Sequence, residues 1–270
     1  HSLDQLTDYD AGVIASSTSS HLEYVQKFIA AGLPTLIDKP FSNSMKGVLQ
    51  VIRRAKQKKI PVCVGFNLRF LPILTKLYTD IRKGKLGKIL SVDIFVGQYL
   101  PQWRSHRDYR KTYSASYFKG GGVALDLIHD IDVVLTLFPK TSLHAIFSDK
   151  LSNLDLDVED IVVFQAKAKP YMHIRLDYLN HIKTRKYTIV GEYGSIECDI
   201  VNKRYILADT QGNCAVYDNE KDFDVQLTYD KEIDHFLFLL QKKGKQDWSD
   251  RALGIDALRI CLTARKHVQK

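Results

Sequence analysis

The sequence lacks several features that would assign it to a specialised class of protein. It has only four cysteines in 270 residues and no C-x-x-C spacing, so a zinc site is not expected. No stretch approaches the roughly 18 uninterrupted apolar residues of a membrane span. The amino-terminal residues have neither the basic nor the apolar region of a signal peptide. These absences predict a cytoplasmic protein with reduced thiols, no membrane partner and no bound metal.

The sequence has fewer acidic residues (31) than lysines and arginines (39). The resulting formal net charge of +8 raises the question of nucleic-acid binding. The basic runs are dispersed over residues 53–59, 82–85 and 242–245, each at the expected end of a helix. None is interleaved with aromatic side chains, as a base-stacking surface would be. We therefore expect no nucleic-acid partner, and a positive field that attracts anionic small molecules.

The first 65 residues have the pattern of a parallel α/β sheet. Hydrophobic residues make up 45% of the chain and charged residues 26%, as in globular proteins. Short apolar strands alternate with amphipathic helices, which is typical of right-handed crossovers. The expected strands are 11–15, 34–38 and 60–65, and the expected helices are 21–31 and 44–59. Residues 1–65 are therefore predicted to form the carboxyl-terminal half of a dinucleotide-binding domain.

From Phe66 the pattern changes to that of an α+β domain, predicted over residues 66–270. An arginine- and aromatic-rich loop, 97–119, precedes an apolar helix that contains Asp126 and His129. The other expected elements are helices at 71–82, 231–242 and 251–268 and strands at 87–96, 143–147, 160–168, 171–179, 186–190, 194–200 and 204–209. The fold class is thus α/β, a partial Rossmann-like sheet followed by a large, mostly antiparallel sheet with helices on one face.

The helix after the glycine triplet 120–122 carries the first candidate catalytic pair. Asp126 and His129 stand three residues apart, on one helical face. A carboxylate beside an imidazole fixes its tautomer and raises its basicity, as a general acid/base near neutral pH requires. Asp130 or Asp132 could compete as the imidazole's partner, and the pair could also be a buried structural couple.

A second charged group is held rigidly by the sequence Asp38-Lys39-Pro40 at the end of an expected strand. Taken alone, a Lys-Pro pair is more typical of a surface lysine before a turn. Asn67-Leu-Arg69-Phe70 and the glycine triplet follow it in order. With these motifs downstream, Lys39 could bind a reacting hydroxyl or carbonyl group, helped by desolvation that lowers its pKa.

Two polar segments are candidate binding elements. Hydroxyls and free N–H groups after the first strand suit a diphosphate or ribose, although these serines could simply cap the helix. In the loop 97–119, arginines beside aromatic rings suit a sugar face with a carboxylate or phosphate, although such a loop could also be solvated or lie at a subunit interface. The first segment contains Ser16, Ser17, Thr18 and His21, and the second Tyr99, Trp103, Arg104, Tyr109 and Arg110.

The order Asp38-Lys39-Pro40, Asn67-Leu-Arg69-Phe70, glycine triplet and Asp126/His129 resembles the glucose–fructose oxidoreductase / inositol dehydrogenase / MocA family over nearly the whole chain. The resemblance implies hydride transfer between NAD or NADP and a sugar, in a homo-oligomer, dimer or tetramer. It makes Lys39, Asp126 and His129 catalytic, and implies a cis bond before Pro40. It places Ser16, Ser17, Thr18, His21, Asp38, Lys39, Pro40 and Asn67 beside the cofactor and Arg69, Tyr99, Trp103, Arg104, Tyr109 and Arg110 beside the substrate.

The chain departs from the family pattern in two ways. Many members place three residues between the aspartate and the histidine, whereas two separate Asp126 and His129. The family's G-x-G-x-x-G turn is absent, and in family order it would precede the first residue. A truncated polypeptide, or a catalytically silent sugar-binding or assembly module, is therefore an open alternative. The segment from Tyr99 to Arg104 resembles members of sialic- or legionaminic-acid-type surface-sugar pathways, which predicts an anionic substrate.

Overall fold

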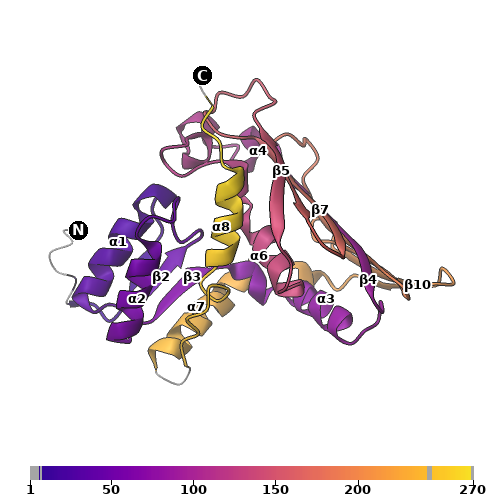
Figure 1. Ribbon diagram of the computed structural model, residues 1–270, viewed down its shortest axis with the longest axis horizontal. Coiled ribbons are helices and arrows are strands. Elements are labelled where there is room, and N and C mark those ends of the chain that lie inside the picture. Colours follow the sequence, from indigo (N-terminus) through magenta and orange to yellow (C-terminus); the bar gives the residue numbers. More distant parts are fainter. Residues whose placement is uncertain (1–5, 7, 242–244, 269–270) are drawn as a thin grey trace.

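The computed structural model describes residues 6, 8–241 and 245–268. Most of the basic run at 242–245 lies outside these residues. A small α/β unit and a large twisted sheet flank helix α8 (Ile255–Ala264), which stands between them (Figure 1). Within the described ranges, no helix is long and apolar enough to cross a bilayer.

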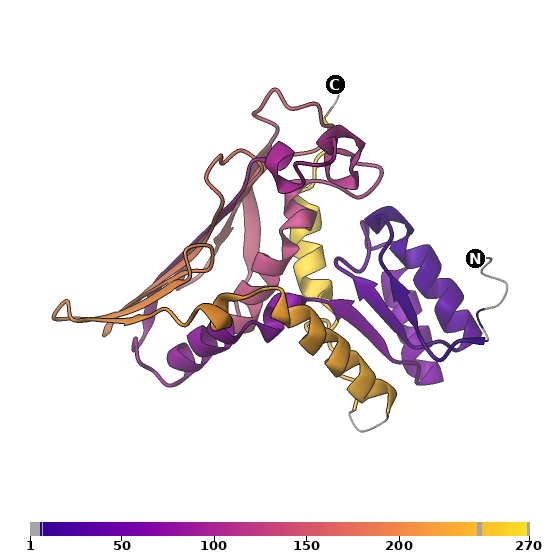
Figure 2. The same ribbon diagram turned by 180° about the vertical axis from the view of Figure 1, so that it is seen from behind.

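The small sheet is parallel, as the alternation of strands and helices predicted. Its strands run in the order β1 (Gly12–Ile14), β2 (Thr35–Asp38) and β3 (Val62–Gly65). Helices α1 (Thr18–Ala31) and α2 (Val48–Lys58) cover one face. The other face is covered by α7 (Leu227–Leu240), whose Phe236 and Leu239 pack on Leu36 and Cys63 (Figure 2). A segment from the distant carboxyl-terminal part of the chain thus completes this unit.

Strand β1 is an edge strand in the described chain. Its Val13 lies in register with Leu36 of β2, which in turn lies beside Cys63 of β3. Leu36 and Cys63 are buried under α7, whereas Val13 remains 63% exposed. Within the described residues, one edge of the sheet and part of one face are therefore open.

The large sheet has eight strands, and it is antiparallel except for the central pair β4 and β7. Its strands, in spatial order, are β11 (Cys214–Tyr217), β10 (Arg204–Asp209), β9 (Gly194–Asp199), β8 (Thr184–Gly191), β4 (Ile89–Gly97), β7 (Tyr171–Asp177), β6 (Ile161–Ala166) and β5 (Leu143–Asp149). The predicted mostly antiparallel sheet is confirmed, and β11 is an additional strand that was not expected.

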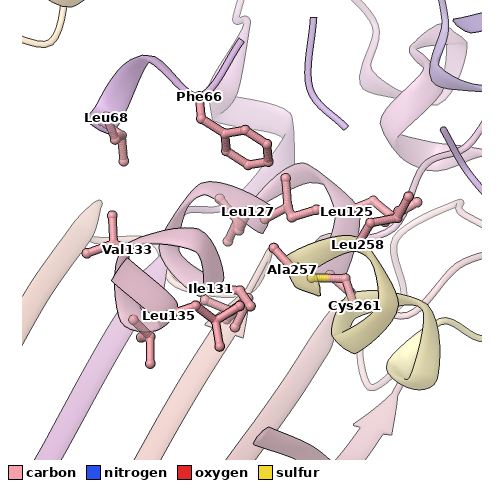
Figure 3. Close-up of a cluster of buried hydrophobic side chains, with 14 of the residues drawn as sticks. Phe66, Leu68, Leu125, Leu127, Ile131, Val133, Leu135, Ala257, Leu258 and Cys261 are labelled. Carbon is pink, nitrogen blue, oxygen red and sulfur yellow. The ribbon is translucent and has the colours of Figure 1, made fainter. Parts of the chain in front are cut away.

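One face of this sheet is packed by helices. They are α3 (Pro72–Arg82), α5 (Val123–Asp126), α6 (Ile128–Leu137) and α8, with the short α4 (Leu100–Trp103) above the sheet. Figure 3 shows the core where Phe66 lies above α5 and α6, and where Leu258 and Cys261 of α8 meet them from the side. The chain therefore places the end of β3, the helix pair and the sheet around one contiguous apolar core.

The expected continuous helix around Asp126 and His129 is in fact two helices. Helix α5 ends at Asp126, Leu127 departs from helical geometry with φ −98° and ψ 20°, and α6 begins at Ile128. Before them, Gly122 has a φ of +111°, and a Cβ there would lie 2.4 Å from a Glu159 carboxylate oxygen. The glycine triplet therefore permits close packing against the segment that contains Glu159.

Candidate active site

Lys39 lies at the carboxyl end of β2 and reaches across to the second unit. The Lys39–Pro40 peptide bond is cis, as the family resemblance implied. The Lys39 Nζ donates a hydrogen bond of 2.6 Å to the backbone carbonyl oxygen of Asp126. The rigid strand end and this contact fix the ammonium group beside the break between α5 and α6.

The carboxylate of Asp126 is buried and held by two tyrosines. The Tyr178 hydroxyl donates to its Oδ2 at 2.6 Å, and the Tyr113 hydroxyl also bonds to it. Burial, followed by the charge of Asp126, raises the pKa of Tyr178 well above its ordinary value. For Tyr113 the charge of Asp126 is the largest cause of a raised pKa. Both hydroxyls therefore remain protonated donors that stabilise the charged carboxylate.

His129, by contrast, does not contact the Asp126 carboxylate through its buried nitrogen. Its Nδ1 has no hydrogen-bond partner in the part of the chain that the structure describes. The ring meets Phe66 edge-on, with centroids 5.7 Å apart. The expectation that Asp126 orients His129 is thus not met, because Leu127 breaks the helical face and Tyr178 takes the carboxylate.

The pKa of His129 lies well below its ordinary value. Burial is the largest cause, followed by the positive charges of Lys39, Arg185 and Arg69. The imidazole is therefore neutral at physiological pH and able to accept a proton. Desolvation and nearby cations, rather than a carboxylate partner, set its protonation state.

The other two candidate partners of the imidazole are engaged elsewhere. Asp130 accepts from the Tyr187 hydroxyl at 2.5 Å and from Arg185 Nη2 at 3.2 Å. Asp132 accepts from Nε and Nη2 of Arg69 at 2.8 and 2.6 Å. Each carboxylate is buried with its own counter-ion, so neither is positioned to polarise His129.

The polar segment after β1 lies at the start of α1. Ser16 and Ser17 are exposed, and Ser17 stands at the N-cap without a side-chain capping bond. Thr18 is buried against Gly120. His21 is buried, with Nδ1 2.8 Å from the Pro40 carbonyl and Nε2 3.0 Å from the Ser16 carbonyl. Because both of its nitrogens lie against carbonyls, His21 joins the segments after β1 and β2.

The remaining predicted cofactor residues differ in exposure. Asp38 is exposed, and its Oδ1 accepts a bond of 2.8 Å from the Lys39 backbone N–H. Asn67 is buried, and its amide donates at 2.8 Å to the hydroxyl of Thr228 on α7. Asp38 is therefore accessible at the carboxyl edge of the small sheet, whereas the Asn67 amide joins the 3-10 turn after β3 to α7.

The guanidinium of Arg69 is fully engaged with the protein itself. Besides its two bonds to Asp132, it donates to the carbonyls of Arg251 and Ala252 at 2.7 and 2.8 Å. Its paired carboxylate is only 1% exposed. Arg69 thus anchors the segment before α8, and its predicted contact with substrate remains a prediction.

The predicted loop residues lie in different surroundings. Tyr99 stacks on His181 at 4.2 Å, and the Tyr109 hydroxyl accepts from the Asp155 backbone N–H. Arg110 forms an exposed ion pair with Asp108 at 2.8 Å, and Arg104 is exposed. Trp103 donates from Nε1 to the Gln98 carbonyl and meets Tyr178 edge-on at 5.2 Å.

A cavity of about 370 Å³ opens beside Asp126, under the central strands of the large sheet. Of the six predicted substrate residues, Trp103 alone lines it. The lining also contains Lys183 and Arg185, which the sequence analysis did not single out. A signal for Arg185 was available, because it shares the inward face of β8 with buried Tyr187 and Ile189.

Comparison with known proteins identifies the chain. Residues 1–66 match the sequence model described as "Oxidoreductase family, NAD-binding Rossmann fold", and residues 75–197 match the GFO/IDH/MocA C-terminal domain. The chain is 30% identical to the rhizopine catabolism protein MocA of Rhizobium meliloti over 126 residues, 46% of this chain and 37% of that protein. It is 26% identical to an inositol 2-dehydrogenase of Acidothermus cellulolyticus over 198 residues, 70% of this chain and 54% of that protein.

Solved structures share the fold. An oxidoreductase from Thermotoga maritima superposes with a TM-score of 0.80 at 15% identity, covering 98% of this chain and 78% of the other. The UDP-N-acetylglucosamine 3-dehydrogenase GnnA from Acidithiobacillus ferrooxidans gives a TM-score of 0.72 at 18% identity, covering 98% and 80%. The chain spans about a third to a half of the two curated relatives named above. Its two matched segments, in the order found here, show that the chain belongs to the GFO/IDH/MocA oxidoreductase family.

Proposed function

We propose that this protein transfers hydride between NAD or NADP and a hydroxyl or carbonyl group of a sugar derivative. The observation that carries the proposal is the meeting of Lys39 with Asp126, beside a neutral His129 and an open cavity. A cationic donor and a neutral imidazole are the two groups needed to bind a hydroxyl and to remove its proton.

The residues at the carboxyl edge of the small sheet fit a dinucleotide. The exposed hydroxyls of Ser16 and Ser17 and the uncapped start of α1 offer donors to phosphate oxygens. The exposed carboxylate of Asp38 offers an acceptor to ribose hydroxyls. When bound, a nicotinamide cofactor supplies the hydride acceptor or donor.

The proton chemistry is assigned to Lys39 and His129. Lys39 is hydrogen-bonded to an uncharged carbonyl, so its positive charge is available to stabilise a developing alkoxide. The neutral imidazole accepts the hydroxyl proton in the oxidation direction and returns it in reduction. Asp126, held by Tyr178 and Tyr113, positions the carbonyl that binds Lys39.

The substrate is proposed to be an anionic sugar or nucleotide-sugar of surface-polysaccharide metabolism. The names of the relatives point to polyols and sugars, among them inositol and UDP-N-acetylglucosamine. The positive net charge of +8 and the cations that line the cavity favour an anionic member of this class. The resemblance of the segment from Tyr99 to Arg104 to surface-sugar enzymes supports the same assignment.

The test is a turnover assay with NAD and NADP against myo-inositol, D-glucose, D-glucuronate and UDP-N-acetylglucosamine, read by nicotinamide absorbance. Lys39→Met and His129→Gln should each lower the turnover of the wild-type protein by about 10²–10⁴, with both variants still folded. Retained activity in both would remove these residues from the mechanism.

A second candidate function is a catalytically silent sugar-binding or assembly module. It is favoured by the cavity beside Asp126, which is lined by residues 96–225 and could hold a sugar without a dinucleotide. Titration with NADH and NADPH, followed by nicotinamide fluorescence and thermal shift, separates the two. Micromolar binding supports the oxidoreductase, whereas sugar binding without either cofactor supports the silent module.

Self-association is proposed as a dimer or tetramer formed through the outer face of the large sheet. This face carries aromatic residues such as Tyr171, which is 51% exposed. Light scattering coupled to size-exclusion chromatography tests it, and a monomer at micromolar concentration would contradict it.

A further inference from the structure

We propose that Lys183 and Arg185 form an anion-binding subsite, which holds a carboxylate or phosphate group of the substrate at the start of β8. The inference deepens the proposed function and rests on it for the identity of the ligand as a sugar. It assigns recognition of the substrate's negative charge to residues on the wall of the cavity beside Asp126, instead of to the exposed loop residues Arg104 and Arg110.

Arg185 is an arginine with unused hydrogen-bonding capacity. Its side chain is 20% exposed and makes one hydrogen bond to the protein, from Nη2 to Asp130 at 3.2 Å. Asp130 also accepts the much shorter bond from Tyr187, 2.5 Å long. The guanidinium has five N–H groups, so most of its donors find no acceptor within the described ranges.

Arg69 is the comparison for Arg185, because its guanidinium is fully hydrogen-bonded within the protein. It makes four hydrogen bonds, two of them a side-on pair to Asp132 and two to backbone carbonyls. Arg185 has a comparably buried carboxylate beside it but meets it with one long bond. A planar donor group that is only partly satisfied, on the wall of a cavity, fits an incoming carboxylate or phosphate.

Lys183 places a second cation on the same wall. It lies immediately before the first residue of β8 and is exposed, and it lines the same cavity as Arg185. The charged lining residues are Lys183, Arg185 and Asp126, two cations against one carboxylate. Asp130, which does not line the cavity, is the ion-pair partner of Arg185, and Lys183 is the cation on this wall that is exposed.

The subsite shares its cavity with the residues next to Lys39. Asp126 and Leu127 line the cavity and adjoin Lys39, which is bonded to the Asp126 carbonyl. Trp103 lines the cavity too and offers an apolar ring surface to the sugar. An anion at Lys183 and Arg185 would therefore fix which hydroxyl of the ring approaches Lys39, which makes the subsite a determinant of specificity.

The experiment measures sugar binding without cofactor, by quenching of Trp103 fluorescence in a Trp248→Phe background. The chain has only two tryptophans, so this background isolates the signal of the cavity. The ligands are D-glucuronate, D-glucose 6-phosphate and D-glucose, at constant ionic strength. The first two distinguish a carboxylate from a phosphate, and the third is the neutral reference.

The variants are Lys183→Ala and Arg185→Lys, with Lys186→Ala as the matched control. Arg185→Lys keeps a counter-ion for Asp130, so the variant is expected to fold. Lys186 lies next to Arg185 on β8, but it pairs with Glu197 at 2.6 Å on the outer face. Its substitution removes the same formal charge as Lys183→Ala does, from a nearby residue that does not line the cavity.

We expect wild-type protein and Lys186→Ala to bind at least one anionic sugar about tenfold more tightly than D-glucose. Lys183→Ala and Arg185→Lys should each weaken that anion roughly fivefold to tenfold and leave D-glucose unchanged. The inference is overturned by unchanged anion binding in both variants, by equal loss in Lys186→Ala, or by a wild-type protein without preference for either anion.

These results are separable from those on the proposed function. Anion binding with no nicotinamide binding or turnover would remove the oxidoreductase proposal and leave the subsite in place. Turnover of neutral sugars by a protein that shows no preference for anions would do the reverse.

Discussion

The ammonium of Lys39 donates a 2.6 Å hydrogen bond to the backbone carbonyl of Asp126, 87 residues further along the chain. The Asp126 carboxylate is held separately by the Tyr178 hydroxyl, also at 2.6 Å. A carbonyl orients the lysine without neutralising it, so the positive charge stays available to a substrate oxygen. This contact joins the end of the small parallel sheet to the helix pair that covers the large sheet.

Replacing Lys39 by methionine keeps the bulk of the side chain and removes its charge. We expect kcat to fall by about 10²–10⁴, the usual contribution of a group in acid–base catalysis. The free energy of unfolding should change by only about 1 kcal/mol, because one hydrogen bond is lost. Steady-state kinetics and thermal melts check both, with exposed Lys46→Met as the control. Full activity in Lys39→Met would contradict the assignment.

The depressed pKa of His129 predicts an unusual acid limb of the pH profile. Because burial and three cations disfavour the imidazolium, kcat/KM should stay level as pH falls through about 6.5 and decline only below it. Native stability should decrease on acidification below the same value, since the unfolded state binds the proton more readily. His129→Gln should lessen that decrease. An activity that halves near pH 6.5 would argue that His129 is not the base.

Tyr178→Phe and Tyr205→Phe form a matched pair. Each buried hydroxyl donates to a buried carboxylate, Tyr178 to Asp126 at 2.6 Å and Tyr205 to Asp80 at 2.7 Å. Both variants should lose about 1–3 kcal/mol of stability, because a carboxylate loses a donor. Only Tyr178→Phe should also lower kcat, by displacing the partner of Lys39. Equal kinetics in the two variants would show that the Tyr178 contact is structural alone.

Arg69→Ala should destabilise the protein by about 3–5 kcal/mol, because it leaves the buried Asp132 without its counter-ion. Denaturant unfolding measures this, and Arg69→Ala/Asp132→Ala should recover part of the loss. Arg110→Ala, which breaks an exposed ion pair with Asp108, should leave stability unchanged. A stable Arg69→Ala with a raised KM would instead support the predicted contact of Arg69 with substrate.

Glu232 should make the protein less stable as pH rises through neutrality. Burial, then the charge of Asp38, raises its pKa to about 7, so the native state holds its proton more tightly than the unfolded state does. Stability from this source is complete below about pH 4.5 and is lost as pH rises through 7. Glu232→Gln should therefore gain about 1 kcal/mol at pH 8, with solvent screening limiting the gain. Thermal melts from pH 4.5 to 8 check it, and a variant whose melting follows the wild-type pH dependence would contradict it.

The alternation of apolar and polar residues was sufficient to predict most of the helices and strands. It predicted the parallel strands before Phe66, the later antiparallel strands and the helix that ends at Arg82. The motif around Lys39 led to the cis bond before Pro40 through the family resemblance. These features depend on residues only a few positions apart, so their periodicity and turn motifs can be identified from the sequence alone.

Only the tertiary structure decided which groups act together. The spacing of Asp126 and His129 predicted a pair, but Leu127 interrupts the helix and Tyr178, 52 residues away, occupies the carboxylate. Likewise, Arg185 became a candidate ligand contact only when β8 was placed beside β4 and its inward face met the cavity. Local periodicity fixes which face a residue occupies, whereas its partner depends on which distant segments the sheet and the core bring together.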